Sequence, residues 1–332
     1  MTEMIRRTRR QRELIENELL SPAATRSLDS RGRAVSEEPD EFRTAFERDR
    51  DRVIHSKAFR RLKHKTQVFL NPEGDHYVTR LTHTMQVAQV GRAMAAGLAL
   101  NEALTEAICL AHDVGHSPFG HTGEDALTPY VEGEWLHSAQ GVRVLSVLEP
   151  VNLSWEVLDG VRAHSWKIEE PPATPEGQLC RFADRIAYLT HDVADAIRAQ
   201  VISFSDLPPA ASALGQSARE WIGTMVTSVI EASTTAGHVT IHPDVLGRMN
   251  EVRDFMFGRV YLGPEMEAPK TRAITVIRDL VDFFAATPHQ VPESYKVDDA
   301  TDLTRAIDYV AGMTDRFALT THDRLFRPTL FD

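Results

Sequence analysis

Residues 110–124 read LAHDVGHSPFGHTGE, a segment in which three histidines and two carboxylates follow an apolar run. The apolar residues from Ala103 to Ala111 recur at helical spacing, so His112 and Asp113 stand at the end of a predicted helix. An imidazole nitrogen and a neighbouring carboxylate oxygen can bind one cation, and this donor set suits Mg, Mn, Fe, Co, Ni or Zn. Because two ligands bind a metal weakly, the segment predicts a site completed from other helices.

Two further stretches can complete this site. Upstream, a predicted helix begins just before His83, which can supply a third ligand. Downstream, residues 181–192, RFADRIAYLTHD, space Asp184, Tyr188 and Asp192 four residues apart, so that they share one face of a helix. Asp184 can therefore be the fourth ligand, with Tyr188 and Asp192 facing the same cavity.

Histidine is concentrated around the first stretch. Of the 14 histidines, 6 lie between residues 76 and 137: His76, His83, His112, His116, His121 and His137. A single histidine most often lies on the surface or forms a hydrogen-bonded part of the core. Crowding of histidines among carboxylates instead favours a chemical role.

The remaining pattern predicts an all-α fold. Apolar residues such as Ile54, Ala58 and Leu62 recur at helical spacing, and no stretch shows sustained strand alternation. Further helices are predicted over residues 178–199, 221–232, 245–261, 271–286 and 303–318.

Residues that interrupt helices divide the sequence into three predicted regions. Residues 1–40 are polar and read as an N-terminal arm with at most a short helix. Residues 203–218, SFSDLPPAASALGQSA, are rich in Pro, Ser and Gly and mark the best candidate boundary. We therefore expect a metal-binding core over 41–202 and a helical region over 203–332 that packs on it.

Composition limits the class of protein. The 332 residues carry a formal net charge of −11, which argues against a broad nucleic-acid or anionic-membrane surface. The two cysteines, Cys109 and Cys180, form no CxxC motif, so neither a disulfide framework nor a thiolate metal site is indicated. Without a secretory signal or a membrane-spanning segment in the sequence, we expect a cytoplasmic protein and no membrane partner.

The ordered motifs resemble a known family. The pattern H…HD…D is similar to that of HD-domain metal-dependent phosphohydrolases, and the wider set resembles the deoxyguanosinetriphosphate triphosphohydrolase-like proteins within that superfamily. Resemblance extends over most of residues 40–320, through FRTAFERDRDRVIHSKAFRRLKHKTQVF (from Phe42), EGDHYVTRLTHT, AHDVGHSPFGHTGE, RFADRIAYLTHDVADA and DYVAGMTDR. It implies an HD-domain helical bundle with additional C-terminal helices.

The resemblance also implies a reaction and its residues. Deoxynucleoside triphosphates (dNTPs) would be hydrolysed at the α-phosphorus to deoxynucleoside and tripolyphosphate, in control of the dNTP pool. The implied metal ligands are His83, His112, Asp113 and Asp184. The implied catalytic dyad is His121 with Glu124, for water activation and proton transfer.

The implied phosphate contacts are Arg80 and His116, and the implied sugar contacts are Gln67, Tyr188 and Asp192. Arg185 is either a further phosphate contact or a surface ion pair.

One segment departs from the family pattern. Residues 135–140 read WLHSAQ where the family commonly has His-Asn-Glu-Gln after the histidine-rich segment, so the histidine is kept and the glutamate is lost. His137 can still act as a second acid or phosphate donor. Its carboxylate partner would then be Glu124 or Asp125.

The stretch from Arg43 to Lys65 carries nine basic and three acidic residues, a local charge of +6. It is either a solvated helix with ion pairs three residues apart, such as Glu47 with Arg50, and Asp49 with Arg52, or a wall that attracts triphosphate. Both interpretations can hold for different residues.

The expected cofactor is a divalent metal ion, with Mg or Mn favoured and Co, Ni, Fe or Zn also compatible. The expected partners are a dNTP substrate, other copies of the chain in a homo-oligomer and, as in some family members, a nucleotide activator; nucleic acid is not expected. Two alternatives stay open, an HD-domain phosphohydrolase acting on another nucleotide or phosphate ester and a non-catalytic nucleotide-sensing protein. The preferred base and the native metal are not specified by the motifs.

Overall fold

The computed structural model describes residues 4–68, 77–297 and 300–328, so His76 lies outside the described residues. Across these ranges the chain is helical, and its only extended pairings are two isolated bridges, Arg33 with Ser154 and Thr66 with Thr79. Helix accounts for 68% of the residues that the structure describes. The all-α prediction is confirmed.

The helices of the first part of the chain are α1 (Arg9–Leu19), α2 (Ala45–His55), α3 (Lys57–Arg61), α4 (Arg80–Gly97), α5 (Glu102–Ala111), α6 (His121–Leu127), α7 (His137–Arg143), α8 (Trp155–Ala163) and α9 (Pro175–Arg198). Those that follow are α10 (Pro209–Leu214), α11 (Ala218–Ala236), α12 (Pro243–Met256), α13 (Pro264–Ala286), α14 (Asp302–Ala311) and α15 (Asp315–Phe326).

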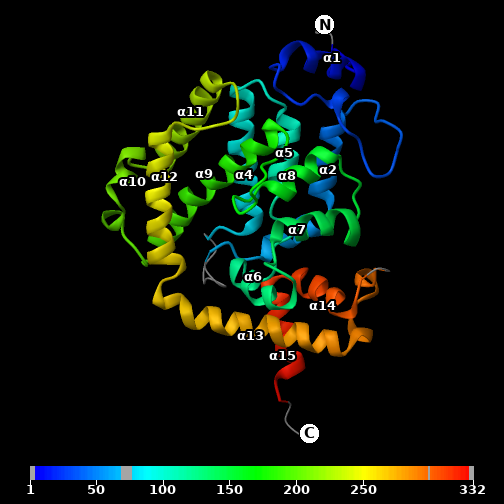
Figure 1. Cartoon of the computed structure of the whole chain (residues 1–332), viewed down its shortest axis with the longest axis vertical. Coiled ribbons are helices and arrows are strands. Elements are labelled where there is room, and N and C mark those ends of the chain that lie inside the picture. Colours follow the sequence, from blue (N-terminus) through cyan, green and yellow to red (C-terminus); the bar gives the residue numbers. More distant parts are fainter. Residues whose placement is uncertain (1–3, 69–76, 298–299, 329–332) are drawn as a thin grey trace.

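The larger hydrophobic core lies where α4, α5 and α9 meet (Figure 1). Met94 of α4, Ile108 of α5 and Ile186 of α9 are fully buried in it. A side chain at Gly91 would place its Cβ 2.9 Å from Cys109 Sγ, so glycine lets α4 approach α5 closely. This packing brings the three helices that carry the predicted metal ligands into contact.

A smaller core lies below the first in Figure 1, where α13 packs against α6, α14 and α15. Its buried residues include Leu127, Ile277 and Ile307. Helices α10, α11 and α12 instead contribute to the larger core. The division between residues 202 and 203 remains a prediction.

Two helices differ from the sequence prediction. The single helix predicted over 303–318 is wrong, because Gly312 and Met313 separate α14 from α15, and Thr314 caps α15 by accepting a hydrogen bond from the Phe317 N–H at 3.2 Å. The helix predicted over 245–261 is α12 continued by a π-helical turn, Phe257–Tyr261.

The N-terminal arm packs on the larger core. Backbone and hydroxyl groups of Thr25 donate to Glu176 on α9, and Ser30 donates to Glu156 on α8. Arginines of the arm also reach α2, as in the ion pairs of Arg12 with Glu47 and Arg33 with Asp49.

These contacts correct one interpretation of the basic stretch. Arg50 pairs with Asp51 and Glu106, and Arg52 pairs with Glu37, rather than with Glu47 and Asp49 three residues earlier. Glu47 and Asp49 instead pair with arginines of the arm, so tertiary partners replace the local ones that were expected for these two carboxylates.

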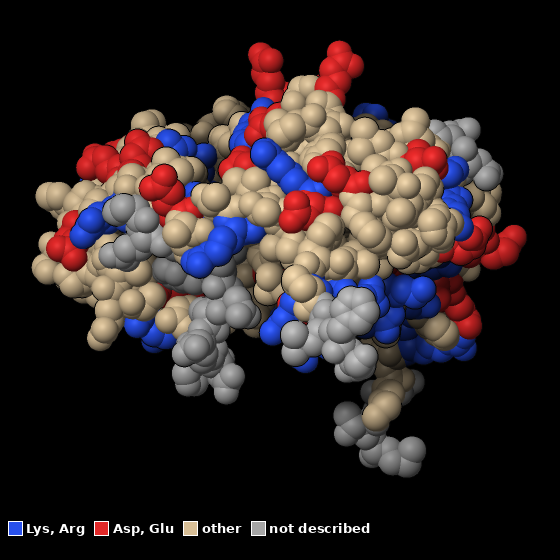
Figure 2. Space-filling view, turned by 90° about the horizontal axis from the view of Figure 1, so that it is seen from below, with Lys and Arg blue, Asp and Glu red and all other residues tan. Residues whose placement is uncertain are grey.

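The surface carries charges of both signs. Figure 2 shows the end of the molecule around α13 and α15, where acidic and basic side chains are interspersed and Lys and Arg gather toward the lower right. None of the described helices combines the length and the apolar character needed to cross a membrane.

Candidate active site

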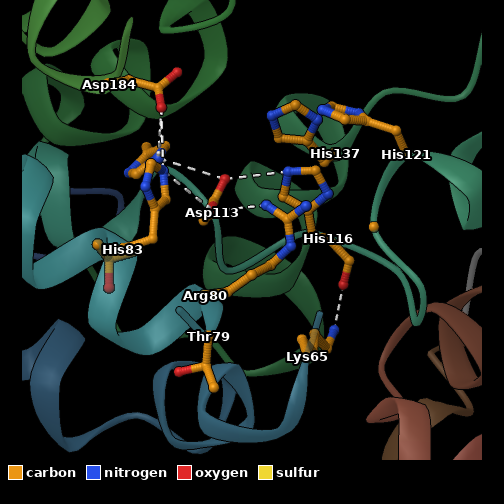
Figure 3. A network of polar contacts seen from close by, with 12 residues as sticks. Lys65, Thr79, Arg80, His83, Asp113, His116, His121, His137 and Asp184 are labelled. Atoms are coloured by element: carbon orange, nitrogen blue, oxygen red, sulfur yellow. Dashed lines mark hydrogen bonds and ion pairs between the residues drawn. The ribbon is translucent and has the colours of Figure 1, made fainter. Parts of the chain in front are cut away.

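The four predicted metal ligands come together from three helices, and Figure 3 labels three of them, His83, Asp113 and Asp184. His83 lies in the first turn of α4, His112 and Asp113 end α5, and Asp184 lies in the middle of α9. Oδ1 of Asp184 is 3.1 Å from Nε2 of His83 and 3.8 Å from Nε2 of His112. Oδ1 of Asp113 is 3.4 Å from Nε2 of His112. The donor atoms of His83, His112 and Asp184 therefore lie close together, with Asp113 beside His112.

The histidines are oriented as metal ligands usually are. The Nδ1–H of His112 donates to the carbonyl of Cys109 at 2.6 Å, which leaves the buried Nε2 without a hydrogen-bond partner and with its lone pair toward the carboxylates. Nδ1 of His83 lies 3.4 Å from Nε2 of His191, a neighbour that fixes the His83 ring. His83, His112 and Asp184 could hold a metal ion together, so this donor set fits a divalent cation.

Both carboxylates are held ionised. Burial opposes ionisation of Asp113, but His112, Arg80 and His116 keep its pKa well below the usual range. Burial likewise opposes ionisation of Asp184. The hydrogen bond from His83 and the nearby ring of His112 outweigh burial and lower the pKa of Asp184 to about 2. Two anionic oxygens at neutral pH are what a divalent cation requires.

A second cluster is centred on Glu124 of α6. Its Oε2 lies 3.1 Å from Nδ1 of His121, and its Oε1 lies 2.5 Å from Nδ1 of His137 on α7. Of the two carboxylates expected for His137, Glu124 is therefore the one beside it, whereas Asp125 is exposed. Burial opposes ionisation of Glu124, but His137 and His121 keep its pKa well below the usual range.

His116 connects the two clusters. Its Nε2 is 3.1 Å from Oδ1 of Asp113, and its ring stacks on His137 with centroids 3.8 Å apart. Gly115 allows this packing, because an added Cβ would lie 2.1 Å from the carbonyl oxygen of His137. Burial, Arg80 and His137 hold the pKa of His116 well below its usual range, so it is a neutral donor to Asp113.

Arg80 lies against the metal-ligand cluster from the start of α4. Its Nη1 donates to Oδ2 of Asp113 at 2.8 Å, and its buried Nε has no hydrogen-bond partner. Gln67 follows Thr66, which bridges to Thr79 at the N-cap of α4, so Gln67 lies near Arg80. Oε1 of Gln67 is also buried without a partner.

The sugar contacts predicted on α9 lie on successive turns beyond Asp184. Burial raises the pKa of Tyr188 to about 12, so its hydroxyl is protonated at neutral pH. Burial raises the pKa of Asp192 to about 7, although a hydrogen bond from the Tyr261 hydroxyl at 2.5 Å opposes this.

Arg185 is not brought into either cluster. Its guanidinium lies over the ring of Trp166, 4.2 Å from the centroid, and Nη1 donates to Oδ1 of Asn250 at 3.3 Å. Arg185 is buried, so it does not form the surface ion pair that was one of the two roles considered for it. A phosphate role for Arg185 stays a prediction.

Comparison with known proteins identifies the family. Residues 80–189 match the HD domain, and residues 239–324 match the phosphohydrolase-associated domain. A deoxyguanosinetriphosphate triphosphohydrolase-like protein of Caldanaerobacter subterraneus is 46% identical over 324 residues, which cover 96% of this chain and 95% of that protein. The chain belongs to the deoxyguanosinetriphosphate triphosphohydrolase-like family. Another member, from Desulfatibacillum aliphaticivorans, is 41% identical over 98% of this chain and 99% of its own length. The chain is thus an HD-domain hydrolase.

Solved structures agree with this fold. A phosphohydrolase from Bacteroides thetaiotaomicron aligns with a TM-score of 0.50 at 17% identity, over 81% of this chain and 66% of its own. A hypothetical protein from Aquifex aeolicus aligns with a TM-score of 0.50 at 21% identity, over 85% of this chain and 68% of its own. At these identities the likeness shows a shared fold alone.

Sequence reasoning missed four side chains that line or support this site: Lys65, His164, His191 and Tyr261. Lys65 is buried and donates to the carbonyls of His116 and Ala311, and burial lowers its pKa to about 7. Lys65 is one of nine basic residues in the stretch from Arg43 to Lys65, and nothing in the sequence distinguishes it from the other eight. His191 adjoins Asp192 in a motif already identified, whereas His164 and Tyr261 lie in segments with no local signature.

Proposed function

We propose that this protein hydrolyses dNTPs at the α-phosphorus, releasing a deoxynucleoside and tripolyphosphate, in control of the dNTP pool. One observation carries the proposal: a single helix, α9, presents the candidate metal ligand Asp184 and, on its next two turns, Tyr188 and Asp192. This arrangement supports a substrate whose phosphate and sugar lie side by side along α9. The names of the family's members support the same reaction.

The reaction joins a water oxygen to the α-phosphorus and breaks the bond from that phosphorus to the 5′ oxygen. The water must lose a proton and the 5′ oxygen must gain one. His121 suits this transfer, because its Nδ1–H donates to Glu124 while its side chain is 70% exposed, which leaves Nε2 free for substrate. Glu124 orients the ring and stabilises its protonated form.

The other residues bind and orient the substrate. A divalent cation held by His83, His112, Asp113 and Asp184 would polarise the α-phosphate and lower the pKa of bound water. The unpartnered Nε of Arg80 suits a phosphate oxygen. Oε1 of Gln67 and the carboxylate of Asp192 can accept from a 3′ hydroxyl, and Tyr188 can exclude a 2′ substituent.

Product analysis tests this proposal. The purified protein is incubated with each of the four dNTPs, singly, with Mg²⁺, Mn²⁺ or Co²⁺, and ion-exchange and reversed-phase chromatography identify the products. We expect tripolyphosphate and deoxynucleoside, and much slower turnover of the matching ribonucleotides. Orthophosphate or pyrophosphate as the product would overturn the proposal and favour an HD phosphohydrolase with another substrate.

We also propose a homo-oligomer whose activity responds to a second nucleotide, on the resemblance to the family. Mass photometry would measure the oligomeric state. Assays of one dNTP with a second added at low concentration would reveal activation as a rise in initial rate. A monomer with no response to any mixture would contradict this extension without affecting the reaction itself.

A further inference from the structure

His164 lies beside the candidate active site and has no role in the reaction described above. It is fully buried at the C-terminal end of α8, and its Nδ1–H donates to the carbonyl of Val161 at 2.8 Å. His112 ends α5 in the same way, with its Nδ1–H donating to the carbonyl three residues earlier. In both residues this bond commits Nδ1 and directs Nε2 into the site.

The Nε2 atom of His164 contacts the second cluster. It lies 2.9 Å from Nε2 of His137, whose Nδ1 lies 2.5 Å from Oε1 of Glu124. The other oxygen of Glu124 lies 3.1 Å from Nδ1 of His121. A continuous chain of hydrogen bonds therefore runs from α8 through α7 to α6 and ends at the exposed ring of His121.

The acceptors at Val161 and Glu124 determine how the contact between His137 and His164 is protonated. The Val161 carbonyl and the ionised Glu124 carboxylate only accept, so the outer nitrogens of the two rings both carry protons. Two bare nitrogen lone pairs at 2.9 Å would repel, so the contact between His137 and His164 needs a third proton. The hydrogen bond between the rings therefore has its proton on one of the two Nε2 atoms.

We propose that His164 is a positioning residue for the hydrolysis. Its Nε2 forms a hydrogen bond with Nε2 of His137 and so fixes the orientation of that ring. His137 in turn bonds to one oxygen of Glu124, and the other oxygen of Glu124 bonds to His121. Both nitrogens of His137 are engaged in this chain, so His137 supports Glu124 rather than contacting phosphate. This inference rests on the proposed function of His121 as the proton-transferring group.

A competing role for His164 is metal ligation. Asp113, His137 and His164 each offer a ligand atom, and these atoms lie within 4.8 Å of one another. Against this, the nearest partner of His164 Nε2 is a histidine at hydrogen-bonding distance, and its ring meets His112 edge-on with centroids 5.0 Å apart. Metal content therefore separates the two roles.

The matched variants His164→Gln and His164→Asn test the proposal, because their side chains carry the same amide and differ by one methylene. The amide of Gln can extend to His137 and accept its proton, whereas that of Asn can bond Val161 but is too short for His137. We expect kcat to fall about 10-fold or more in His164→Asn and to stay within about threefold in His164→Gln. KM and bound Mn²⁺ should change little in either variant.

The assays use the full chain loaded with Mn²⁺, a dNTP and, separately, bis(4-nitrophenyl) phosphate as a general ester. Circular dichroism confirms folding of each variant. Unchanged kcat in both variants, equal losses in both, or loss of Mn²⁺ from His164→Asn would overturn the positioning role. A wild-type protein that cleaves only the general ester would refute the dNTP proposal, while the ester still measures the effect of His164. A wild type inactive on both substrates would overturn both proposals.

Discussion

At the scale of single residues, the Asp113 carboxylate contacts three different side chains of the site. It accepts from Arg80 and His116 while lying beside His112, so one side chain belongs to the metal-ligand cluster and is linked through His116 to the second cluster. Asp113→Ala should lose bound metal, measured by mass spectrometry, and reduce kcat by at least about 100-fold. The exposed Asp125→Ala should behave as wild type. Hydrolysis that survives Asp113→Ala would contradict the site assignment.

Glu124 is predicted to act on proton transfer rather than on binding. Glu124→Gln keeps the shape of the side chain but replaces one accepting oxygen by an amide group that donates, so one of the two histidines loses its partner. We expect kcat to fall by roughly 10²-fold or more with KM little changed. Asp125→Asn, the adjacent exposed position, is the control. A change confined to KM would argue for a binding role instead.

Asp192 should make stability depend on pH. Burial raises its pKa from 3.8 to about 7, so between these values the folded chain binds a proton that the unfolded chain has released. This residue therefore lowers the free energy of unfolding as pH rises from about 4 to about 7.

Asp192→Asn removes this titration and can still accept the hydrogen bond from Tyr261. Its stability relative to wild type should rise over the same range and level off above it, as measured by urea unfolding at intervals between pH 5 and pH 8. Asp323→Asn, an exposed site, should show a difference independent of pH. A constant difference for Asp192→Asn would mean that the carboxyl titrates normally.

At the scale of elements, the start of α15 supports the histidine-rich loop. Asp315 accepts from the backbone N–H of Phe119 at 2.9 Å and, with its other oxygen, from the N–H and hydroxyl of Thr66. Phe119 has φ of +62°, a left-handed conformation that is costly for a bulky residue. The contact from α15 therefore stabilises the loop between the two clusters.

Asp315→Ala should uncouple this loop from the C-terminal helices. We expect the free energy of unfolding to fall by about 1–3 kcal/mol, because buried donors lose a charged acceptor. The value of kcat should fall while bound metal is retained, since α15 supplies no metal ligand. Asp323→Ala, further along α15 and exposed, should leave stability and rate unchanged. Loss of metal in Asp315→Ala would show that the loop also shapes the metal site.

At the scale of the whole molecule, the metal should stabilise the larger core. Its candidate ligands come from α4, α5 and α9, and the ion would offset the repulsion between two anionic carboxylates. A ligand present at 100 times its Kd stabilises a fold by about 2.7 kcal/mol. EDTA should therefore lower the melting temperature and Mn²⁺ should restore it. In Asp184→Asn the response should be small, and an equal response there would place the ion elsewhere.

Much of the fold and the candidate metal ligands could be predicted because their signals are local. Helical spacing of apolar residues predicts α4, α5 and α9, and the order of His83, His112, Asp113 and Asp184 predicts a shared cation. The net charge of −11 likewise does not prevent a polyanionic ligand, because the stretch from Arg43 to Lys65 alone carries +6.

Side chains whose roles depend on distant partners could not be predicted in this way. Glu124 and Asp125 are equal candidates for His137 in the sequence, and only the contact between His137 and Glu124 decides between them. Asp49 binds Arg33 of the arm rather than Arg52 on its own helix. His164 contacts His137 from 27 residues away, and Tyr261 reaches Asp192 from 69 residues away. A residue's neighbours within a helix follow from a repeat of 3.6 residues, but its contacts between helices depend on how whole helices pack.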